Sequence, residues 1–228
     1  VLGLAARQAD RTQGLMTRFL ITGVNRGIGA ALYAQAVALG HQVIGTTRDG
    51  RDGTVPLVLE MPETIAEQLS GIGPLDILIN NAGVISPDRQ SPLDMDFAGF
   101  AHTLTINSIA PLAVAQAVLP QLRESAAPKI LTISSQMAWM GYRKADRIAY
   151  RASKAAVNKV MQGLATALEP EGIPVALVDP AWVRTDMGGA NAEEDPHDVA
   201  CGVLNIARNL TLKGTGQFFR FKGEEREF

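Results

Sequence analysis

A tyrosine and a lysine stand four residues apart in the segment "RIAYRASKAAVN", which begins at Arg147. The segment has helical spacing, so this step places Tyr150 and Lys154 on neighbouring turns of one helix face. An ammonium near a phenol stabilises the phenolate, and we expect Lys154 to lower the pKa of Tyr150 from its ordinary value of about 10. Tyr150 can then exchange a proton with a reacting oxygen. The spacing alone is weak evidence, because three tyrosines in the chain can produce it by chance.

A second group of residues indicates phosphate binding. "FLITGVNRGIGAAL" places Gly23, Gly27 and Gly29 between an apolar, strand-like run and a helical segment. Backbone amides in such a turn, with a helix N-terminus behind them, can hold a pyrophosphate, and a Cβ would obstruct the turn or the phosphate. The spacing G-x3-G-x-G differs from the common G-x-G-x-x-G. The alternative is a strand–helix turn that binds no ligand.

Two arginines bear on which dinucleotide binds. Arg26 lies within the glycine turn, and Arg48 follows the second strand-like run, which ends in Thr46 and Thr47. An acidic residue at that strand end accepts a hydrogen bond from a free ribose 2′-hydroxyl, whereas arginine accommodates a 2′-phosphate. Asp49 is interpreted as lying beyond the contact position, so the sequence favours NADP (NADPH) over NAD. The alternative is that both arginines are solvated surface residues.

The elements that must position these residues alternate between strands and helices. Apolar runs of the kind found in parallel strands buried on both faces are at 18–22, 42–47, 56–60, 76–80, 129–134, 174–179 and 216–221. Helical spacing covers 30–39, 97–122, 149–168 and 197–210. The pattern predicts an α/β fold: a single-domain, Rossmann-type, doubly wound and mainly seven-stranded parallel sheet flanked by helices.

Composition narrows the class of protein. The chain has 228 residues, 46% of them apolar, and a net charge of −2, which favours neither nucleic acid nor an anionic membrane. No uninterrupted apolar run approaches the about 18 residues that span a bilayer. Lone Cys201 and the lack of a Cys/His cluster predict no metal and a reducing, cytoplasmic location. Residues 1–16 are interpreted as a disordered tail or an expression remnant, and 17–228 as one domain.

Several further motifs appear in one order, and with them the chain resembles the short-chain dehydrogenase/reductase family. The motifs are "TGVNRGIG" (22–29), "NNAG" (80–83), Asn107 in "TLTINSIAPL", Ser135 in "ILTISS", "YRASK" (150–154) and "PAWVRTDMGG" (180–189). The wording "YRASKAAVN", "TDMGG" and "GQFFRFKGEE" is most similar to the C-factor or sniffer-type carbonyl reductase subgroup. The resemblance implies a Rossmann-fold domain that binds NAD(P).

The resemblance also implies the site. The family's catalytic tetrad falls on Asn107, Ser135, Tyr150 and Lys154, with Ser135 at a strand end where its hydroxyl can hold the substrate oxygen. The family's lysine also holds the nicotinamide ribose. The implied cofactor-binding residues are Gly23, Asn25, Arg26, Gly27, Ile28, Gly29, Thr47, Arg48, Glu60, Met61, Asn81, Ala82, Gly83, Tyr150, Lys154, Pro180, Ala181, Val183 and Thr185.

Two backbone features accompany these residues. Pro111 has no amide hydrogen to donate to the Asn107 carbonyl, which leaves that carbonyl free in mid-helix to hold a water. The family relays protons from its lysine through such a water; the alternative is a proline kink that only shapes the helix. Ala181 stands where the family commonly has glycine, and alanine costs about 1 kcal/mol there if the position needs a positive φ.

The substrate is the least determined part. The loops after the fifth and sixth strands carry Gln136, Met137, Trp139, Met140, Trp182 and Met187, which suit an apolar carbonyl substrate, core packing or dimer contacts. Arg143, Lys144 and Arg147 in the same region are either solvated or close over the cofactor. We expect an NADP-dependent enzyme that interconverts small-molecule carbonyls and secondary alcohols. The alternative is a cofactor-binding signalling or interaction protein on the same fold. Family members often pair through two long helices, so the resemblance allows a homodimer or a homotetramer.

Overall fold

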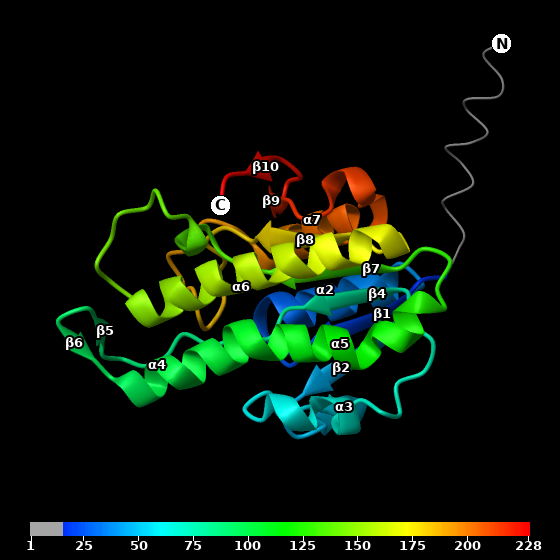
Figure 1. Cartoon of the computed structure of the whole chain (residues 1–228), viewed down its shortest axis with the longest axis horizontal. Coiled ribbons are helices and arrows are strands. Elements are labelled where there is room, and N and C mark those ends of the chain that lie inside the picture. Colours follow the sequence, from blue (N-terminus) through cyan, green and yellow to red (C-terminus); the bar gives the residue numbers. More distant parts are fainter. Residues whose placement is uncertain (1–15) are drawn as a thin grey trace, which may run out of the picture.

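The computed structural model describes residues 16–228, in which one sheet carries helices on both faces (Figure 1). The sheet order is β10-β9-β8-β7-β4-β1-β2-β3. Its strands are β1 (Arg18–Thr22), β2 (Gln42–Thr47), β3 (Val55–Pro56), β4 (Ile77–Asn80), β7 (Lys129–Ile133), β8 (Val175–Asp179), β9 (Phe218–Arg220) and β10 (Glu225–Arg226). The tail predicted for residues 1–16 falls outside the described residues, apart from exposed Met16.

The predicted doubly wound α/β fold is confirmed, with two differences in the sheet. Seven strands pair in parallel, and β10 adds an eighth that runs antiparallel to β9. Strand β10 has no apolar run because it is a two-residue edge of charged side chains. The run predicted as a strand at 56–60 contributes only Pro56 to β3. Its leucines differ in burial but share a place: Leu57 belongs to the buried core, Leu59 packs against that core, and both line a cavity.

The helices divide between the two faces. They are α2 (Gly27–Ala38), α3 (Ile65–Gln68), α4 (Phe97–Leu104), α5 (Ala110–Arg123), α6 (Ile148–Leu168) and α7 (Pro196–Asn209). One buried core joins alternate strand residues such as Leu20 and Leu78 to α5 and α6, and the other joins residues such as Ile21 and Ile79 to α2 and α7. Because side chains alternate between the two faces along each strand, the sheet contributes residues to both cores.

The segment Phe97–Arg123 requires a correction. It is a 27-residue run of α4, a π-helical turn and α5, and by length and composition it is apolar enough to cross a membrane. The expectation that no segment reaches that limit considered only uninterrupted apolar runs. Half of its most apolar window is buried inside the fold, where Val114 and Val118 pack in the core. Packing in this core accounts for the buried half of the window.

A short hairpin supports the start of α6. Strands β5 (Gln90–Ser91) and β6 (Asp94–Met95) pair antiparallel, and the side-chain oxygen of buried Gln90 accepts a hydrogen bond from the Tyr150 amide at 3.2 Å. The first turn of a helix lacks intrahelical acceptors for its amides, so this contact satisfies one of them. The hairpin thereby helps to fix the end of the helix that carries Tyr150.

Candidate active site

A cavity of about 480 Å³ runs along the carboxyl edge of the parallel strands. Strands β1, β2, β4, β7 and β8 all end beside it, because parallel strands present their carboxyl ends at one edge, where doubly wound sheets bind ligands. The glycine turn lines the cavity at one end, and Ser135, Tyr150 and Lys154 line it at the other. Residues from Gly23 to Gly188 therefore face one space.

The glycine turn is shaped as the sequence predicts. Gly23 and Gly27 have positive φ angles of 71° and 56°, which glycine adopts without strain. A Cβ on Gly29 would collide with the carbonyl oxygen of Gly23 and lie 2.5 Å from Nδ2 of Asn81. That Asn81 nitrogen donates to the carbonyl oxygens of Thr22 and Gly23 at 2.9 and 3.1 Å. Helix α2 then begins at Gly27 with no side-chain cap, and its first residues, Gly27 to Gly29, line the cavity.

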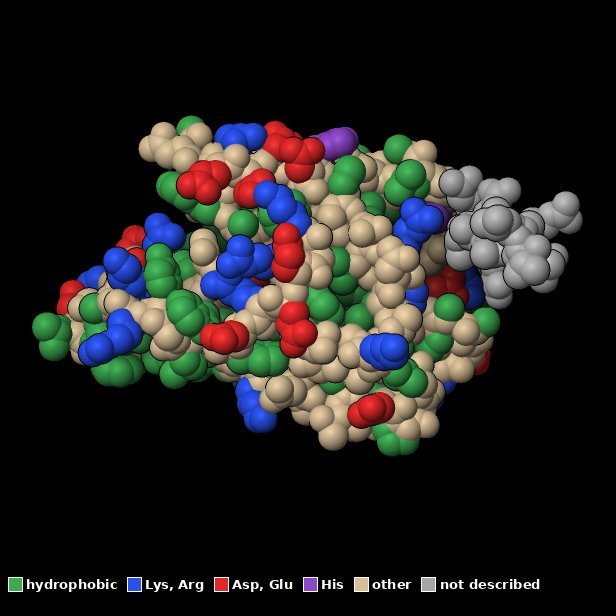
Figure 2. All heavy atoms as spheres, turned by 90° about the horizontal axis from the view of Figure 1, so that it is seen from above, with side chains coloured by type: hydrophobic (Ala, Val, Ile, Leu, Met, Phe, Trp, Pro, Cys, Tyr) green, Lys and Arg blue, Asp and Glu red, His purple; other side chains and the backbone are tan. Residues whose placement is uncertain are grey.

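Each arginine at this end of the cavity is paired with a carboxylate. Arg48 Nη2 lies 2.7 Å from Glu60 Oε1, and Arg26 Nη1 lies 3.3 Å from Asp186 Oδ2. Arg51, which the sequence analysis did not select, also lines the cavity. The same mixture of signs is visible over one whole face of the molecule, where Lys/Arg and Asp/Glu side chains are interspersed (Figure 2).

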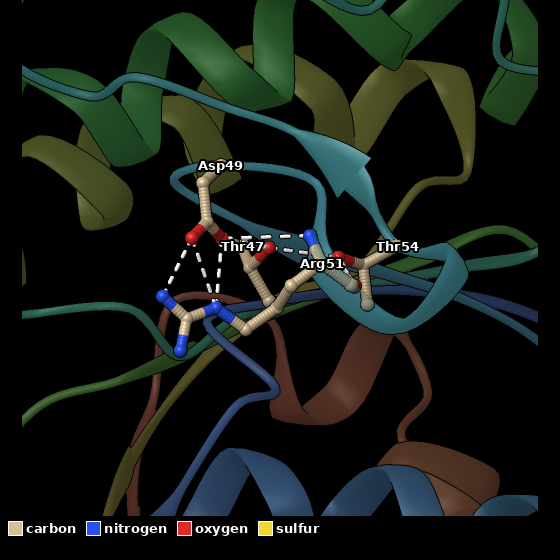
Figure 3. A network of polar contacts seen from close by, with 4 residues as sticks. All are labelled: Thr47, Asp49, Arg51 and Thr54. Carbon is tan, nitrogen blue, oxygen red and sulfur yellow. Dashed lines mark hydrogen bonds and ion pairs between the residues drawn. The ribbon is translucent and has the colours of Figure 1, made fainter.

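Arg51 belongs to a local network at the end of β2 (Figure 3). Its Nε donates to both carboxylate oxygens of Asp49 at 2.9 Å, and Asp49 also accepts from the Thr47 hydroxyl at 3.2 Å. The Arg51 guanidinium lowers the pKa of Asp49 far below its ordinary range. Asp49 is among the residues that line the cavity, and the interpretation that it lies beyond the contact position stays a prediction. A turn through Gly50, with φ of 68°, brings Arg51 back beside it.

The residues expected to do chemistry meet at the opposite end. Tyr150 and Lys154 both lie on α6, and Lys154 Nζ is 5.8 Å from the centre of the Tyr150 ring. Nζ donates to the carbonyl oxygen of Ile133 at 2.9 Å, near the end of β7. Ser135 follows β7 and lines the cavity. Ser134 also borders the cavity, but its hydroxyl donates to Asn158, which agrees with the alternation of side chains along a strand.

The pKa expectation for the tyrosine is wrong for the protein alone. Burial raises the pKa of Tyr150 to about 12, although its hydrogen bond to Ser135 and the charge of Arg147 oppose the rise. Burial also lowers the pKa of Lys154 to about 8. Desolvation disfavours the charged form of each group and is the largest cause of both shifts. Tyr150 is therefore a neutral phenol at neutral pH, as a proton donor must be.

Asn107 lies behind the cavity wall rather than on it. It is 1% exposed, its Oδ1 accepts from the Val84 amide at 2.9 Å, and its Nδ2 donates to the Val84 carbonyl at 2.8 Å and to the Ser153 hydroxyl at 3.0 Å. The helix around it is π-helical over Thr105–Ile109, directly before Pro111. A π turn, rather than a plain proline kink, thus accommodates the missing amide. The water relay at its carbonyl stays a prediction.

Comparison with known proteins agrees with this arrangement. The profile of the short chain dehydrogenase family matches residues 57–196. The chain is also 40% identical over 154 residues to C-signal of Myxococcus xanthus, an alignment that covers 67% of this chain and 92% of that protein. The chain belongs to the short-chain dehydrogenase family. Its family is one of oxidoreductases, and the predicted relationship to the C-factor and sniffer-type subgroup is confirmed.

Solved structures similar to this short-chain dehydrogenase include two carbonyl reductases. The NADPH-bound carbonyl reductase from chicken fatty liver is 27% identical and superposes with a TM-score of 0.82, covering 94% of this chain and all of that one. The carbonyl reductase Sniffer of D. melanogaster superposes with a TM-score of 0.87 over 94% of this chain and all of that one. At 24% identity, the second match is evidence for the fold.

The turn after β8 of this short-chain dehydrogenase contains a strained residue. Ala181 has a φ of 64°, in the left-handed region that glycine adopts freely and alanine does not. We expect Ala181→Gly to raise the free energy of unfolding by up to about 1 kcal/mol, because the relieved strain exceeds the added entropy of the unfolded chain. Urea unfolding measures it, with Gly163→Ala as the reverse exchange at an unstrained helical position. A lower stability for Ala181→Gly would contradict the strain.

Besides Asn107, three residues predicted for the site do not line its cavity. Met61 is 48% exposed and caps a short 3-10 helix (Pro62–Thr64), so its side chain turns to solvent. Met140 is 80% exposed, and Trp139 packs its ring over Gly141. Gln136, Met137 and Met187 do line the cavity, as do the other predicted cofactor residues: Gly23, Asn25, Arg26, Gly27, Ile28, Gly29, Thr47, Arg48, Glu60, Asn81, Ala82, Gly83, Pro180, Ala181, Val183 and Thr185.

Some lining residues were not selected from the sequence. They are Thr46, Asp49, Arg51, Leu57, Leu59, Val84, Ile85, Ile106, Ile133, Ser134, Asp186 and Gly188. Trp182 and Arg147 also line the cavity, and Arg147 is exposed as well, so its closing over the cofactor stays a prediction. Adjacency to a predicted motif could have indicated Val84 and Asp186. Leu57 and Leu59 carried no signal, because a wall residue and a strand residue are equally apolar.

Proposed function

We propose that this chain is an NADP(H)-dependent oxidoreductase that interconverts small-molecule carbonyls and secondary alcohols, with Tyr150 as general acid and base. The observation that carries the proposal is the convergence of Ser135, Tyr150 and Lys154 on the cavity that the glycine turn also lines. The donor set fits a nicotinamide dinucleotide: glycines and a helix N-terminus suit its pyrophosphate, and arginines suit a 2′-phosphate. The NADPH-bound chicken relative supports the cofactor.

The residues have distinct tasks in carbonyl reduction. The hydride for the carbonyl carbon would come from NADPH, held by the glycine turn and the residues at the end of β2. The Tyr150 hydroxyl donates its proton to the carbonyl oxygen, and the Ser135 hydroxyl holds that oxygen in place. Lys154 stabilises the phenolate that forms and holds the nicotinamide ribose. Carbonyl reduction suits the neutral phenol of Tyr150, since the acid is present across the neutral pH range.

The experiment that tests the proposal is loss of NADPH absorbance against a panel of aldehydes and ketones, ring-containing ones included. Met137, Trp182 and Met187 line the cavity, so apolar carbonyls are expected to be turned over best. Tight NADPH binding without turnover on the whole panel would contradict the enzyme and favour a cofactor-binding signalling protein. A cytoplasmic location fits the free, exposed Cys201.

Arg48 is expected to determine the choice between the two dinucleotides. Arg48→Ala should raise the Kd of NADPH roughly 10- to 100-fold and leave the Kd of NADH nearly unchanged, because a charge-assisted hydrogen bond contributes about 1.5–3 kcal/mol. Fluorescence titration with each dinucleotide measures both constants. Arg89→Ala is the matched control, since Arg89 is also an exposed arginine paired with a carboxylate, Asp94.

An unchanged NADPH affinity in Arg48→Ala would contradict the assignment and favour NAD. A second substitution at the same strand end, Asp49→Asn, tests the assignment independently. Removing its charge frees Arg51 from its closest partner, so NADPH binding should become tighter while NADH binding does not. Opposite effects of the two substitutions would place the 2′-phosphate between Arg48 and Arg51.

A further inference from the structure

A buried carboxylate at the end of β8 holds two loops that border the active site. Asp179 is 2% exposed, and its Oδ1 accepts hydrogen bonds from the amides of Gln136 at 2.9 Å and Ala181 at 3.0 Å. Gln136 directly follows Ser135, and Ala181 opens the turn that carries Val183. One oxygen atom therefore connects the loop that follows Ser135 to the turn that contains the strained residue Ala181.

The other oxygen of this carboxylate is paired with the C-terminal strand. Arg226 Nη1 lies 3.0 Å from Asp179 Oδ2, and the two side chains are only 15% and 3% exposed. Arg226 lies on β10, and its guanidinium is 5.9 Å from the ring centre of Phe218 on β9. A buried carboxylate is costly unless it is paired and hydrogen-bonded. Burial raises the pKa of Asp179, while the Ala181 amide, Arg226 and Arg220 oppose this rise.

We propose that Asp179 and Arg226 are a positioning pair for the reaction, in which Arg226 compensates the charge that Asp179 needs to hold the Ser135 and Ala181 loops. The proposal rests on the proposed oxidoreductase function and assigns a part in it to the last strand of the sheet. Neither side chain lines the main cavity, so both act through the residues they hold.

The pair also acts on Tyr150 through its charge. The groups that act on Tyr150 are Ser135 after β7, Asp179 of β8, Arg147 at the start of α6, and Lys154 one turn along that helix. The negative charge of Asp179 raises the pKa of Tyr150. Removing Arg226 leaves that charge uncompensated and should raise the pKa of Tyr150 further, whereas neutralising Asp179 should lower it. A purely structural pair has no reason to move this titration in opposite directions.

The experiment is the pH dependence of kcat/KM for oxidation of a secondary alcohol by NADP+, with the alcohol formed from the best carbonyl of the panel. Oxidation needs the deprotonated phenol, so the rate rises with pH through the pKa of Tyr150. In Arg226→Met the part of the kcat/KM profile that rises with pH (the rising limb) should move to higher pH by about 0.5 unit. At a fixed pH on this limb, that shift lowers the rate roughly threefold. In Asp179→Asn, which keeps an acceptor oxygen for both amides, the limb should move to lower pH.

Two further variants and a second readout complete the test. Arg226→Lys should restore the wild-type limb in large part, and Lys222→Met should leave it in place, because exposed Lys222 pairs with Glu194 instead. Absorbance titration of the phenolate, taken as the difference between each variant and its Tyr150→Phe double variant, measures the same shifts without turnover. If Arg226→Met does not fold, Asp179→Asn alone carries the test.

The outcomes separate this proposal from the function on which it rests. Suppose that the wild type turns over substrate but the rising parts of the pH profiles coincide, or shift in the same direction in both variants. That result would overturn the positioning pair and leave the oxidoreductase function intact. A wild-type protein without turnover would overturn the oxidoreductase, and with it the part of the pair in a reaction. The pair would be established if Arg226→Met and Asp179→Asn shift both the rate profile and the phenolate titration in opposite directions, and if Arg226→Lys restores the wild-type profile.

Discussion

Replacing Tyr150 with phenylalanine is expected to lower kcat for carbonyl reduction by roughly 10²- to 10⁴-fold, the usual contribution of a positioned acid. The phenol is 7% exposed and lies between Ser135 and Lys154. Phenylalanine keeps the ring and its packing, so the fold and the affinity for NADPH should change little. Stopped-flow reduction measures the chemical step, and fluorescence titration measures the binding.

Tyr142→Phe is the matched control for this substitution. Tyr142 is the other tyrosine of the same region, but it is 42% exposed and its ring packs against Arg151 and Lys144 on the surface. Its hydroxyl should be dispensable. If kcat of Tyr150→Phe equals that of the wild type on every active substrate, the proton comes from another group. If Tyr142→Phe loses activity instead, Tyr142 is the proton donor.

The second large effect is expected at Gly29. Gly29→Ala places a Cβ against the Gly23 carbonyl oxygen, a backbone atom that cannot rotate away. The turn must shift, which should lower the free energy of unfolding by about 1–3 kcal/mol and weaken NADPH binding about 100-fold, or about 2.7 kcal/mol. Urea unfolding measures the first change, and fluorescence titration with NADPH measures the second.

Gly163→Ala is the control, because Gly163 lies within α6 with open space around it. Alanine is the better helix former by about 1 kcal/mol, so that variant should be as stable as the wild type or more so, with unchanged binding. Full NADPH affinity in a folded Gly29→Ala protein would show that the glycine turn does not hold the dinucleotide.

The parts of the site predictable from sequence are those set by local geometry. Helical spacing places Tyr150 and Lys154 on one face, and the buried apolar runs place the ends of β1, β4 and β7 at one edge of the sheet. The glycine turn was predictable because a missing Cβ is a steric fact that the residue type itself reports.

What could not be predicted depends on neighbours from distant segments. The pKa of Tyr150 depends on how completely the fold removes water from it. Arg51 reaches Asp49 only because a left-handed glycine turns the chain back, and Arg226 meets Asp179 only once β10 has paired with β9. Pairing partners of this kind leave no periodic pattern in a sequence.

The ion pairs beside the glycine turn and the end of β2 also have a kinetic consequence. Arg26, Arg48 and Arg51 each face a carboxylate, so these six groups together carry no net charge. Beyond a Debye length of about 8 Å, such a cluster exerts little pull on a dinucleotide that approaches through salt water. Under the proposed function, encounter with a dinucleotide would be governed by ordinary diffusion, and NADPH would be selected over NADH after contact, as arginines exchange one anionic partner for another. Discrimination would then lie in how long a dinucleotide stays bound.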